Sequence, residues 1–318
     1  MISVIVPVYN GEGSVGKCLD ALLNQDYMGE KEIIVVDNGS TDRTVDIVRG
    51  FDVKLISQGR RGPAAARNMG VGKASGEIVL FTDADCIPAM DWVSRMVEPF
   101  ADLGIWGVQG AYQTEQKELM ARFSQVEIAE RYERMKRFGD VDFIGTYSAG
   151  YRKEVFSRLG GFDESFPLAS GEDTEFSYRL SKEGYKLVFN PQALVSHMHP
   201  SSLSEYLRVK FWRAYWRVLL YKKHKSKMVR DSYTTQGLKL QIGLFGILFI
   251  SLVVSVFFEA AFLFAVAMYV LIVAATLPFS FWAFKRDKLA GLASPAVLQL
   301  RSLVFIMGLI EGFIRRGS

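Results

Sequence analysis

Two long stretches without charge constrain this chain more than any other feature of its sequence. Residues 240–258 and 260–284 contain no Asp, Glu, Lys or Arg. Each stretch reaches the roughly 20 residues that cross a hydrocarbon core of about 30 Å. A helix that is apolar on every side needs an apolar solvent, so we expect membrane spans near residues 238–258 and 260–284. Two helices buried inside a large soluble protein are the alternative.

A third apolar stretch, residues 292–314, contains Arg301 and Glu311. Charges near the middle of a membrane are costly unless they are paired or face protein, so this segment spans, re-enters or lies flat. Residues 208–230 hold nine Lys or Arg and no acid. By the positive-inside rule, the N-terminal region and the loop after the second span face the cytosol. The expectation is a multi-pass protein of the cell membrane, with two spans rather than three.

The first two thirds of the chain alternate apolar runs with amphipathic segments. This βαβα order predicts an α/β fold: a Rossmann-like, mainly parallel sheet flanked by helices, with ligands at the carboxyl ends of its strands. We expect a catalytic domain at residues 1–204, a basic amphipathic juxtamembrane helix and linker at 205–237, and a helical membrane region at 238–318. Strands are expected at residues 3–8, 32–36, 54–56, 77–82 and 186–190, and helices at 15–24, 44–50, 63–74, 92–100 and 112–139.

Three further features of the sequence limit the compartment and the binding partners of the protein. Residues 2–6 resemble a buried strand, without the basic start and cleavage site of a signal peptide. Cys18 and Cys86 lack CxxC spacing, which indicates a reduced compartment with no structural disulfide or zinc site. The net charge of +4 lies mainly in the juxtamembrane block and favours anionic lipid or phosphate over nucleic acid.

Acidic residues follow the fourth expected strand and begin a later helix. Asp83 and Asp85 come directly after residues 78–82, where two carboxylates suit Mg²⁺ or Mn²⁺ bound to a diphosphate; a solvated acidic loop is the alternative. Glu172 and Asp173 start a helix and either cap it or supply a general base for an acceptor hydroxyl.

Polar residues elsewhere allow two interpretations. Asp37 ends the second expected strand and is either a turn residue or part of a ligand site, whereas Asp42 suits a helix cap. Arg60, Arg61 and Arg67 surround a helix start and form either a surface helix or a cationic lip for a nucleotide or diphosphate.

The spacing of Gly11, Gly13 and Gly16 imitates a dinucleotide-binding motif. An NAD-dependent oxidoreductase is therefore an alternative. Pro7 and three further residues displace the tight turn, and nothing downstream supplies hydride-transfer chemistry.

Six short motifs stand in the order found in family 2 glycosyltransferases, which the chain resembles over about residues 1 to 200. The resemblance implies a GT-A fold and an inverting transfer from a nucleotide-sugar donor. The motifs are Val6-Pro-Val-Tyr-Asn10, Val36-Asp-Asn-Gly-Ser-Thr-Asp42, Ala66-Arg-Asn-Met-Gly70, Asp83-Ala-Asp85, Gly160-Gly-Phe-Asp-Glu164 and Gly171-Glu-Asp173.

The same resemblance implies the roles of individual residues. Asp173 would be the general base, with Glu172 assisting on the acceptor side, and residues 145–150 would line the sugar and acceptor pocket. Mg²⁺ or Mn²⁺ would be bound by Asp85, Asp83 and His197, and the nucleotide by Pro7, Tyr9, Asn10, Asp37, Arg67 and Asp83. The Q-x-x-R-W motif of processive synthases is absent after Asp173, which favours the addition of one sugar per encounter.

The segment before the first span is predicted to be an interfacial helix. Its aromatic and leucine residues between 211 and 220 share one half of a helical wheel, while Lys210, Arg213 and Arg217 lie on the other. The helix either anchors the chain or also holds the phosphate of a polyprenyl-linked acceptor through Arg213 and Arg217. A nucleotidyltransferase and a non-catalytic nucleotide- or lipid-binding scaffold remain alternatives.

Overall fold

A computed structural model of the chain describes residues 1–166, 171–225 and 236–316. The chain divides into two compact units. Unit 1 comprises Met1–Glu115 and Tyr132–Met198, and unit 2 comprises Gln116–Arg131 and His199–Ser318. The second half of the expected linker, residues 226–235, lies outside the described residues. The sequence-based domain limits at residues 204 and 237 stay predictions.

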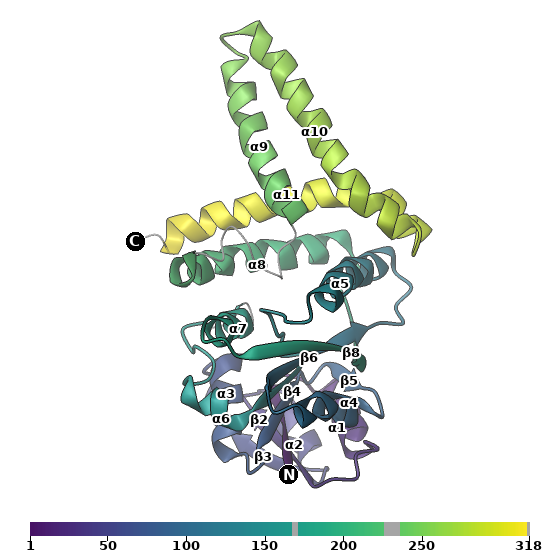
Figure 1. Ribbon diagram of the computed structural model, residues 1–318, viewed down its shortest axis with the longest axis vertical. Coiled ribbons are helices and arrows are strands. Elements are labelled where there is room, and N and C mark those ends of the chain that lie inside the picture. Colours follow the sequence, from purple (N-terminus) through teal and green to yellow (C-terminus); the bar gives the residue numbers. More distant parts are fainter. Residues whose placement is uncertain (167–170, 226–235, 317–318) are drawn as a thin grey trace. The chain divides into compact units, whose positions relative to one another are not determined.

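One sheet forms the centre of unit 1 (Figure 1). Within the described residues it has eight strands in the order β3-β2-β1-β4-β7-β6-β8-β5. The strands are β1 (Ile2–Val8), β2 (Lys31–Asp37), β3 (Lys54–Ser57), β4 (Ile78–Thr82), β5 (Cys86–Pro88), β6 (Ile105–Gln113), β7 (Ser148–Arg152) and β8 (Lys186–His197).

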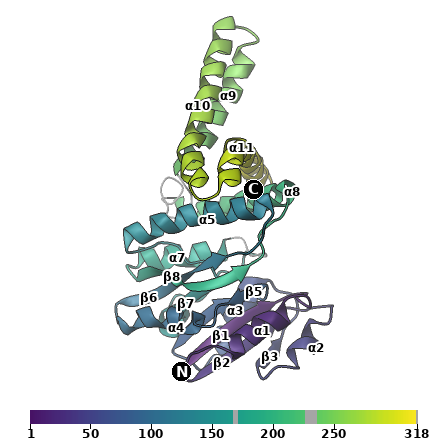
Figure 2. The same ribbon diagram turned by 90° about the vertical axis from the view of Figure 1, so that its right-hand side faces the viewer.

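The direction of the strands confirms the mainly parallel α/β fold. Strands β3, β2, β1 and β4 are parallel neighbours, and β6 and β8 are also parallel. Strand β7 runs antiparallel between β4 and β6, and β5 pairs antiparallel with β8. The carboxyl ends of β1, β2 and β4 therefore lie on the same side of the sheet. Figure 2 shows the sheet turned by 90° from Figure 1.

Helices cover both faces of this sheet. Alternate residues of a strand point to opposite faces, and apolar residues of β1 point to both. Val4 and Val6 of β1 pack in a core with residues of α1 and α4. Ile5 faces α3, where a Cβ added to Gly70 would lie 2.5 Å from the Ile5 side chain. The helices of unit 1 are α1 (Val15–Leu23), α2 (Thr44–Val48), α3 (Pro63–Lys73), α4 (Trp92–Val97), α6 (Lys153–Arg158) and α7 (Glu172–Lys182), with a 3₁₀ turn at Glu98–Ala101.

An aromatic cluster fixes the start of α7 against the sheet. Its members touch with ring centroids 4.9 to 6.4 Å apart, and they come from β4, β7, α6, α7 and the loop before α7. The cluster consists of Phe81, Tyr151, Phe156, Phe162 and Phe176.

Part of the sequence-based assignment is wrong between residues 100 and 200. The polar helix expected at 112–139 is α5 (Leu119–Phe138), and residues 112 and 113 end strand β6. The expected short strand at 186–190 continues to His197. Strand β6 was missed because Gly110 lies inside it, and a glycine within an apolar run resembles a break in the strand. Glycine is required at this position because a Cβ would lie 2.0 Å from the Ser148 hydroxyl.

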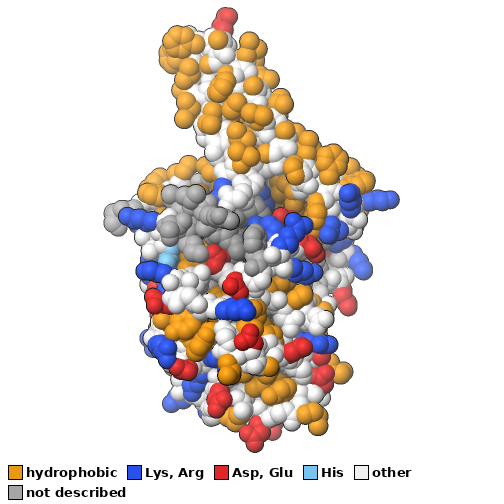
Figure 3. Space-filling model, in the orientation of Figure 1, with side chains coloured by type: hydrophobic (Ala, Val, Ile, Leu, Met, Phe, Trp, Pro, Cys, Tyr) orange, Lys and Arg blue, Asp and Glu red, His pale blue; other side chains and the backbone are white. Residues whose placement is uncertain are grey.

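Unit 2 is helical. It contains the first part of α5 together with α8 (Leu203–Lys223), α9 (Gln236–Val254), α10 (Glu259–Phe284) and α11 (Lys288–Arg316). Of the described helices, α9, α10 and α11 are long and apolar enough to cross a membrane, by length and composition. Helices α9 and α10 form a hairpin, whose visible face is covered with hydrophobic side chains (Figure 3). The number of spans and the cytosolic placement of residues 1–204 stay predictions.

Close packing of α8 against α11 changes the expected arrangement of the interfacial helix. Gly308 and Gly312 of α11 allow this approach, because an added Cβ would lie 2.4 and 2.6 Å from backbone oxygens of α8. Trp216, expected on the membrane-facing half, is buried, as is Arg217 from the supposedly polar half, while Arg213 is exposed. Of the three basic residues expected on one half of this helix, Arg217 is buried, Lys210 is largely buried and Arg213 is exposed.

A buried ion cluster explains the charge in the third apolar stretch. The Arg301 guanidinium donates to Glu127 Oε1 at 2.6 Å, and Lys210 Nζ donates to Glu127 Oε2 at 2.6 Å. Burial alone would raise the pKa of Glu127, but the two cations hold it below its usual range. The cluster joins α5, α8 and α11 within unit 2.

Candidate active site

Arg67 lies at the centre of the candidate site in unit 1. Its Nη2 donates to Asp83 Oδ1 at 2.7 Å and its Nη1 donates to Glu172 Oε1 at 2.8 Å. The side chains of Arg67 and Glu172 are each only 2% exposed, whereas that of Asp83 is 31% exposed. The planar guanidinium fork suits two carboxylates at once, so Arg67 brings the end of β4 and the start of α7 together.

Asp173 begins α7 beside this bridge. Its Oδ1 accepts a hydrogen bond from the Thr174 backbone N–H at 2.6 Å. Burial raises the pKa of Asp173 above its ordinary value, although the Thr174 hydrogen bond and Arg67 act in the opposite direction. A carboxylate with a raised pKa is a better proton acceptor than an ordinary aspartate.

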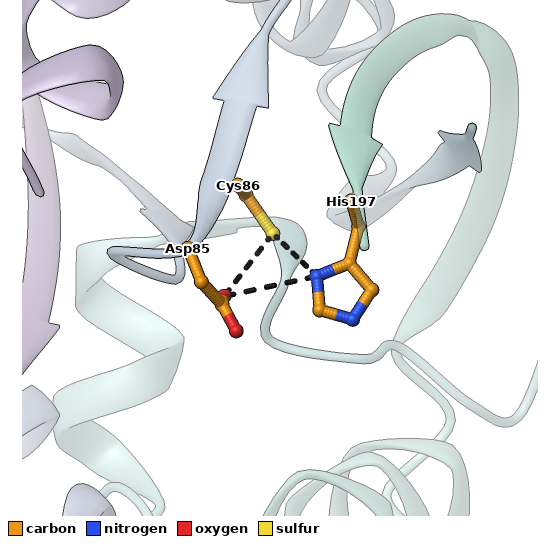
Figure 4. Close-up of side chains that lie close together, drawn as sticks. All are labelled: Asp85, Cys86 and His197. Carbon is orange, nitrogen blue, oxygen red and sulfur yellow. Dashed lines mark hydrogen bonds and ion pairs between the residues drawn. The ribbon is translucent and has the colours of Figure 1, made fainter. Parts of the chain in front are cut away.

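The residues expected to hold a metal lie at the edge of the sheet (Figure 4). Asp85 Oδ1 is 3.8 Å from His197 Nδ1, which brings together two residues that are 112 positions apart in the sequence. The Asp85 side chain is 59% exposed, yet the protein removes water from part of its surroundings, and this partial desolvation, followed by the nearby charge of Asp83, raises its pKa. The Asp83 carboxylate is engaged by Arg67, so Asp85 and His197 are the better placed pair.

Cys86 is the site residue that sequence reasoning missed. It pairs with His197 across strands β5 and β8, and its Sγ is 3.8 Å from His197 Nδ1 and 3.8 Å from Asp85 Oδ1. Only the adjacency of Cys86 to the Asp83-Ala-Asp85 motif could have drawn attention to it. Spacing between cysteines carries no information about a pairing between distant strands.

The expected nucleotide-binding residues gather in two adjoining loops. Asp37 is buried at the end of β2, where its Oδ1 accepts from the Ser40 backbone N–H at 3.1 Å. Asn10 has a positive φ of 50°, and its Oδ1 accepts from the Thr41 backbone N–H at 2.8 Å. Pro7 lies within β1 opposite Val36. The loops after β1 and β2 are thus joined.

Tyr9 is an exposed member of this group. The Arg60 guanidinium lies 4.2 Å from the centroid of its ring and donates to the Tyr9 hydroxyl at 2.8 Å. The arginines expected to form one cationic lip are therefore separated. Arg60 contacts the exposed Tyr9, whereas Arg67 is buried and bonded to Asp83.

Two further motifs bind each other. The Asn68 side-chain amide donates to the Phe162 carbonyl at 2.8 Å, and Asn68 Oδ1 accepts from the Phe162 backbone N–H at 2.9 Å. Gly160 and Gly161 both have positive φ, which glycine adopts at little cost. These contacts hold the Gly160–Glu164 loop beside α3.

Comparison with known proteins agrees with this architecture. The fold and the site define a GT-A domain with an acidic site at the carboxyl ends of its strands. The family description "Glycosyl transferase family 2" matches residues 3–160. The chain belongs to this family of enzymes, which transfer sugar from nucleotide sugars.

Two curated relatives illustrate the similarity. Glycosyltransferase AglE of Haloferax volcanii is 32% identical over 209 residues, which cover 62% of this chain and 66% of that protein. The second is the Methanococcus voltae enzyme named dolichyl N-acetyl-alpha-D-glucosaminyl phosphate 3-beta-D-2,3-diacetamido-2,3-dideoxy-beta-D-glucuronosyltransferase. It is 26% identical over an alignment covering 100% of this chain and 98% of the relative.

A solved structure shows the same fold. The mannosyltransferase PcManGT from Pyrobaculum calidifontis, solved in complex with GDP-Man and Mn²⁺, superimposes with a TM-score of 0.65. Its sequence identity is 23%, and the match covers 99% of this chain and 87% of that one.

Proposed function

We propose that this protein is a membrane-bound inverting glycosyltransferase that moves one sugar from a nucleotide-diphospho-sugar to a hydroxyl of a polyprenyl-phosphate-linked acceptor. The bridge formed by Arg67 between Asp83 and Glu172 supports the proposal, because it joins the end of β4 to the start of α7, where Asp173 follows Glu172 in the sequence. In the proposed reaction, the donor diphosphate binds on the Asp83 side of this bridge and the acceptor hydroxyl binds on the Asp173 side.

The donor nucleotide is assigned to the loops after β1 and β2. Asp37 and Asn10 lie in these joined loops, and the exposed Tyr9 offers an aromatic face beside Arg60. We assign recognition of the base to Asp37 and contact with the nucleotide to Pro7 and Asp83.

The metal is assigned to Asp85 and His197. A carboxylate oxygen suits Mg²⁺ and Mn²⁺, and His197 Nδ1 lies 3.8 Å from the Asp85 carboxylate. A divalent ion held there would neutralise charge on the departing nucleoside diphosphate. PcManGT was solved with GDP-Man and Mn²⁺, which supports a divalent ion here.

Asp173 is assigned the role of general base. It accepts the proton of the acceptor hydroxyl while that oxygen attacks the anomeric carbon, opposite the bond that breaks to the nucleoside diphosphate. Attack from the opposite side inverts the anomeric configuration. Arg67 holds Glu172 in place beside this base through a hydrogen bond of 2.8 Å, and we assign Glu172 to the acceptor side.

The lipid-linked acceptor rests on unit 2 and on one relative. Three described helices are apolar enough to cross a membrane, and Arg213 of α8 is exposed for contact with an acceptor phosphate. Arg217 is buried and supports this role less directly. The relative from Methanococcus voltae is named for a dolichyl-phosphate-linked sugar.

Release of nucleoside diphosphate tests the proposal. Detergent-purified protein is assayed with UDP-, GDP- and dTDP-sugars, with Mg²⁺ or Mn²⁺, and with or without a membrane lipid extract. Lipid-dependent release that disappears in Asp173→Asn but persists in the exposed control Asp52→Asn is the expected result.

Other outcomes select the alternatives. Release of inorganic diphosphate would identify a nucleotidyltransferase. Donor binding without any turnover would identify a scaffold, and release that does not depend on lipid would remove the lipid-linked acceptor.

A further inference from the structure

Arg61 differs from Arg60 and Arg67 in the partner of its side chain. Its Nη2 donates to Glu164 Oε2 at 3.1 Å, and the side chains of Arg61 and Glu164 are 61% and 42% exposed. Glu164 ends the Gly160–Glu164 loop, which precedes α7 in the chain. The ion pair therefore connects the loop between β3 and α3 with the loop that leads toward the proposed base.

The backbone of Arg61 is fixed beside the loop after β2. Its N–H donates to Asn38 Oδ1 at 3.0 Å, and Gln58 Nε2 donates to the same oxygen at 2.9 Å. Asn38 is buried and directly follows Asp37, to which recognition of the nucleotide base is assigned. Because its backbone is held at this position, Arg61 can change partner by rotating its exposed side chain alone.

The exposure of the pair limits how firmly Glu164 holds Arg61. An exposed ion pair changes an equilibrium by no more than about fivefold. A diphosphate carries more negative charge than one carboxylate and offers several oxygens that match the guanidinium fork, so it is the stronger partner. Glu164 keeps a partner after such an exchange, because its Oε1 also accepts from Asn68 Nδ2 at 3.2 Å.

We propose that Arg61 binds the donor's diphosphate, and that Glu164 is the competing partner that takes Arg61 back when the nucleoside diphosphate leaves. This inference rests on the proposed function, which assigns the nucleotide to the loops after β1 and β2. Arg67 is buried and engaged by two carboxylates, so it stays in place while Arg61 moves. Glu164 thereby weakens binding of the nucleoside diphosphate and speeds its release.

Calorimetric titration of nucleoside diphosphates tests the inference without any turnover. UDP, GDP and dTDP are titrated with Mg²⁺ into the full-length, detergent-purified protein, and the one that binds the wild type most tightly is used for the variants. Arg61→Gln should raise its Kd by at least about tenfold, because charge-assisted hydrogen bonds to phosphate are lost. Glu164→Gln should instead lower the Kd by about two- to fivefold, because it removes the competing charge.

Two further measurements separate competition from a general effect of lost charge. In stopped-flow experiments, Glu164→Gln should slow dissociation of the same nucleoside diphosphate by about two- to fivefold, the factor by which its Kd falls. Arg158→Gln and Glu154→Gln are the matched controls, because these residues form an arginine–glutamate pair on α6 whose side chains are 56% and 64% exposed. Both controls should bind within about twofold of the wild type.

The direction of the two changes decides the outcome. A Glu164→Gln protein whose Kd is unchanged or raised, an Arg61→Gln protein with wild-type affinity, or a wild type that binds none of the three nucleotides would overturn the inference. If the Kd values change in opposite directions but no donor is turned over, the exchange stands and the proposed transferase function fails. If a donor is turned over while neither variant changes the Kd, the transferase function stands and the exchange fails.

Discussion

Removal of the Arg67 guanidinium tests the central bridge of the site. Arg67→Met leaves Glu172 buried without its cation and removes the partner of Asp83. Breaking a buried ion pair by deleting one member costs about 3–5 kcal/mol. A kcal/mol corresponds to roughly 2–4 °C in melting temperature for a domain of 150–250 residues, so we expect a decrease of about 6–20 °C.

Thermal unfolding in detergent, followed by intrinsic fluorescence, is the assay. Arg49→Met is the matched control, because Arg49 pairs with Asp46 at 3.3 Å on the surface, where both side chains are more than two thirds exposed. Exposed pairs contribute less than about 1 kcal/mol, so this control should melt within about 4 °C of the wild type.

A double variant separates lost charge from lost packing. Glu172→Gln added to Arg67→Met removes the buried negative charge of Glu172 and should recover part of the lost stability. If Arg67→Met melts like the Arg49→Met control, or if the double variant melts lower than Arg67→Met alone, the account of the bridge is wrong.

Three further variants test the base, the buried cluster and the acceptor. The pKa of Asp173 is raised, so the base should become protonated, and kcat/KM should fall, at a pH above the ordinary aspartate pKa of about 3.9. A loss of activity that begins only below pH 3.9 would contradict this. Asp173→Asn should lower kcat by about 10²–10⁴-fold. Glu127 has a lowered folded-state pKa, so its contribution to stability is present above the unfolded value of about 4.3 and is lost as the pH falls below it. Glu127→Gln should flatten this acid dependence in thermal unfolding and cost about 3 kcal/mol at pH 7, whereas Glu133→Gln, from an exposed pair on the same helix, should do neither. Arg213→Gln should raise the KM of the acceptor more than that of the donor in steady-state assays, and equal effects on both would remove Arg213 from the acceptor site.

The sequence predicted the features that depend on local pattern. Apolar runs ending in Asp37 and Asp83 identified two parallel strands, and the strand ends placed both aspartates at one edge of the sheet. The Glu172 and Asp173 pair was recognised as the start of a helix. Each of these predictions uses neighbouring residues only, which is why it succeeded.

Contacts between segments that are far apart in the chain could not be predicted from the sequence. Strand β6 was hidden by Gly110, which is needed because Ser148 of β7 lies against its backbone. The proximity of Cys86 to His197 depends on the pairing of β5 with β8, and no pattern in either segment indicates that pairing.

Isolation of the glycosylated product tests the central claim most directly. Protein in lipid nanodiscs is given the donor that supports nucleoside diphosphate release, labelled with ¹³C in its sugar, and the lipid product is analysed by mass spectrometry and by NMR of the anomeric carbon. We expect a single labelled sugar on a polyprenyl-phosphate-linked lipid, with the anomeric configuration opposite to that of the donor and no product from Asp173→Asn. A retained configuration, or labelled sugar found only free in solution, would contradict it.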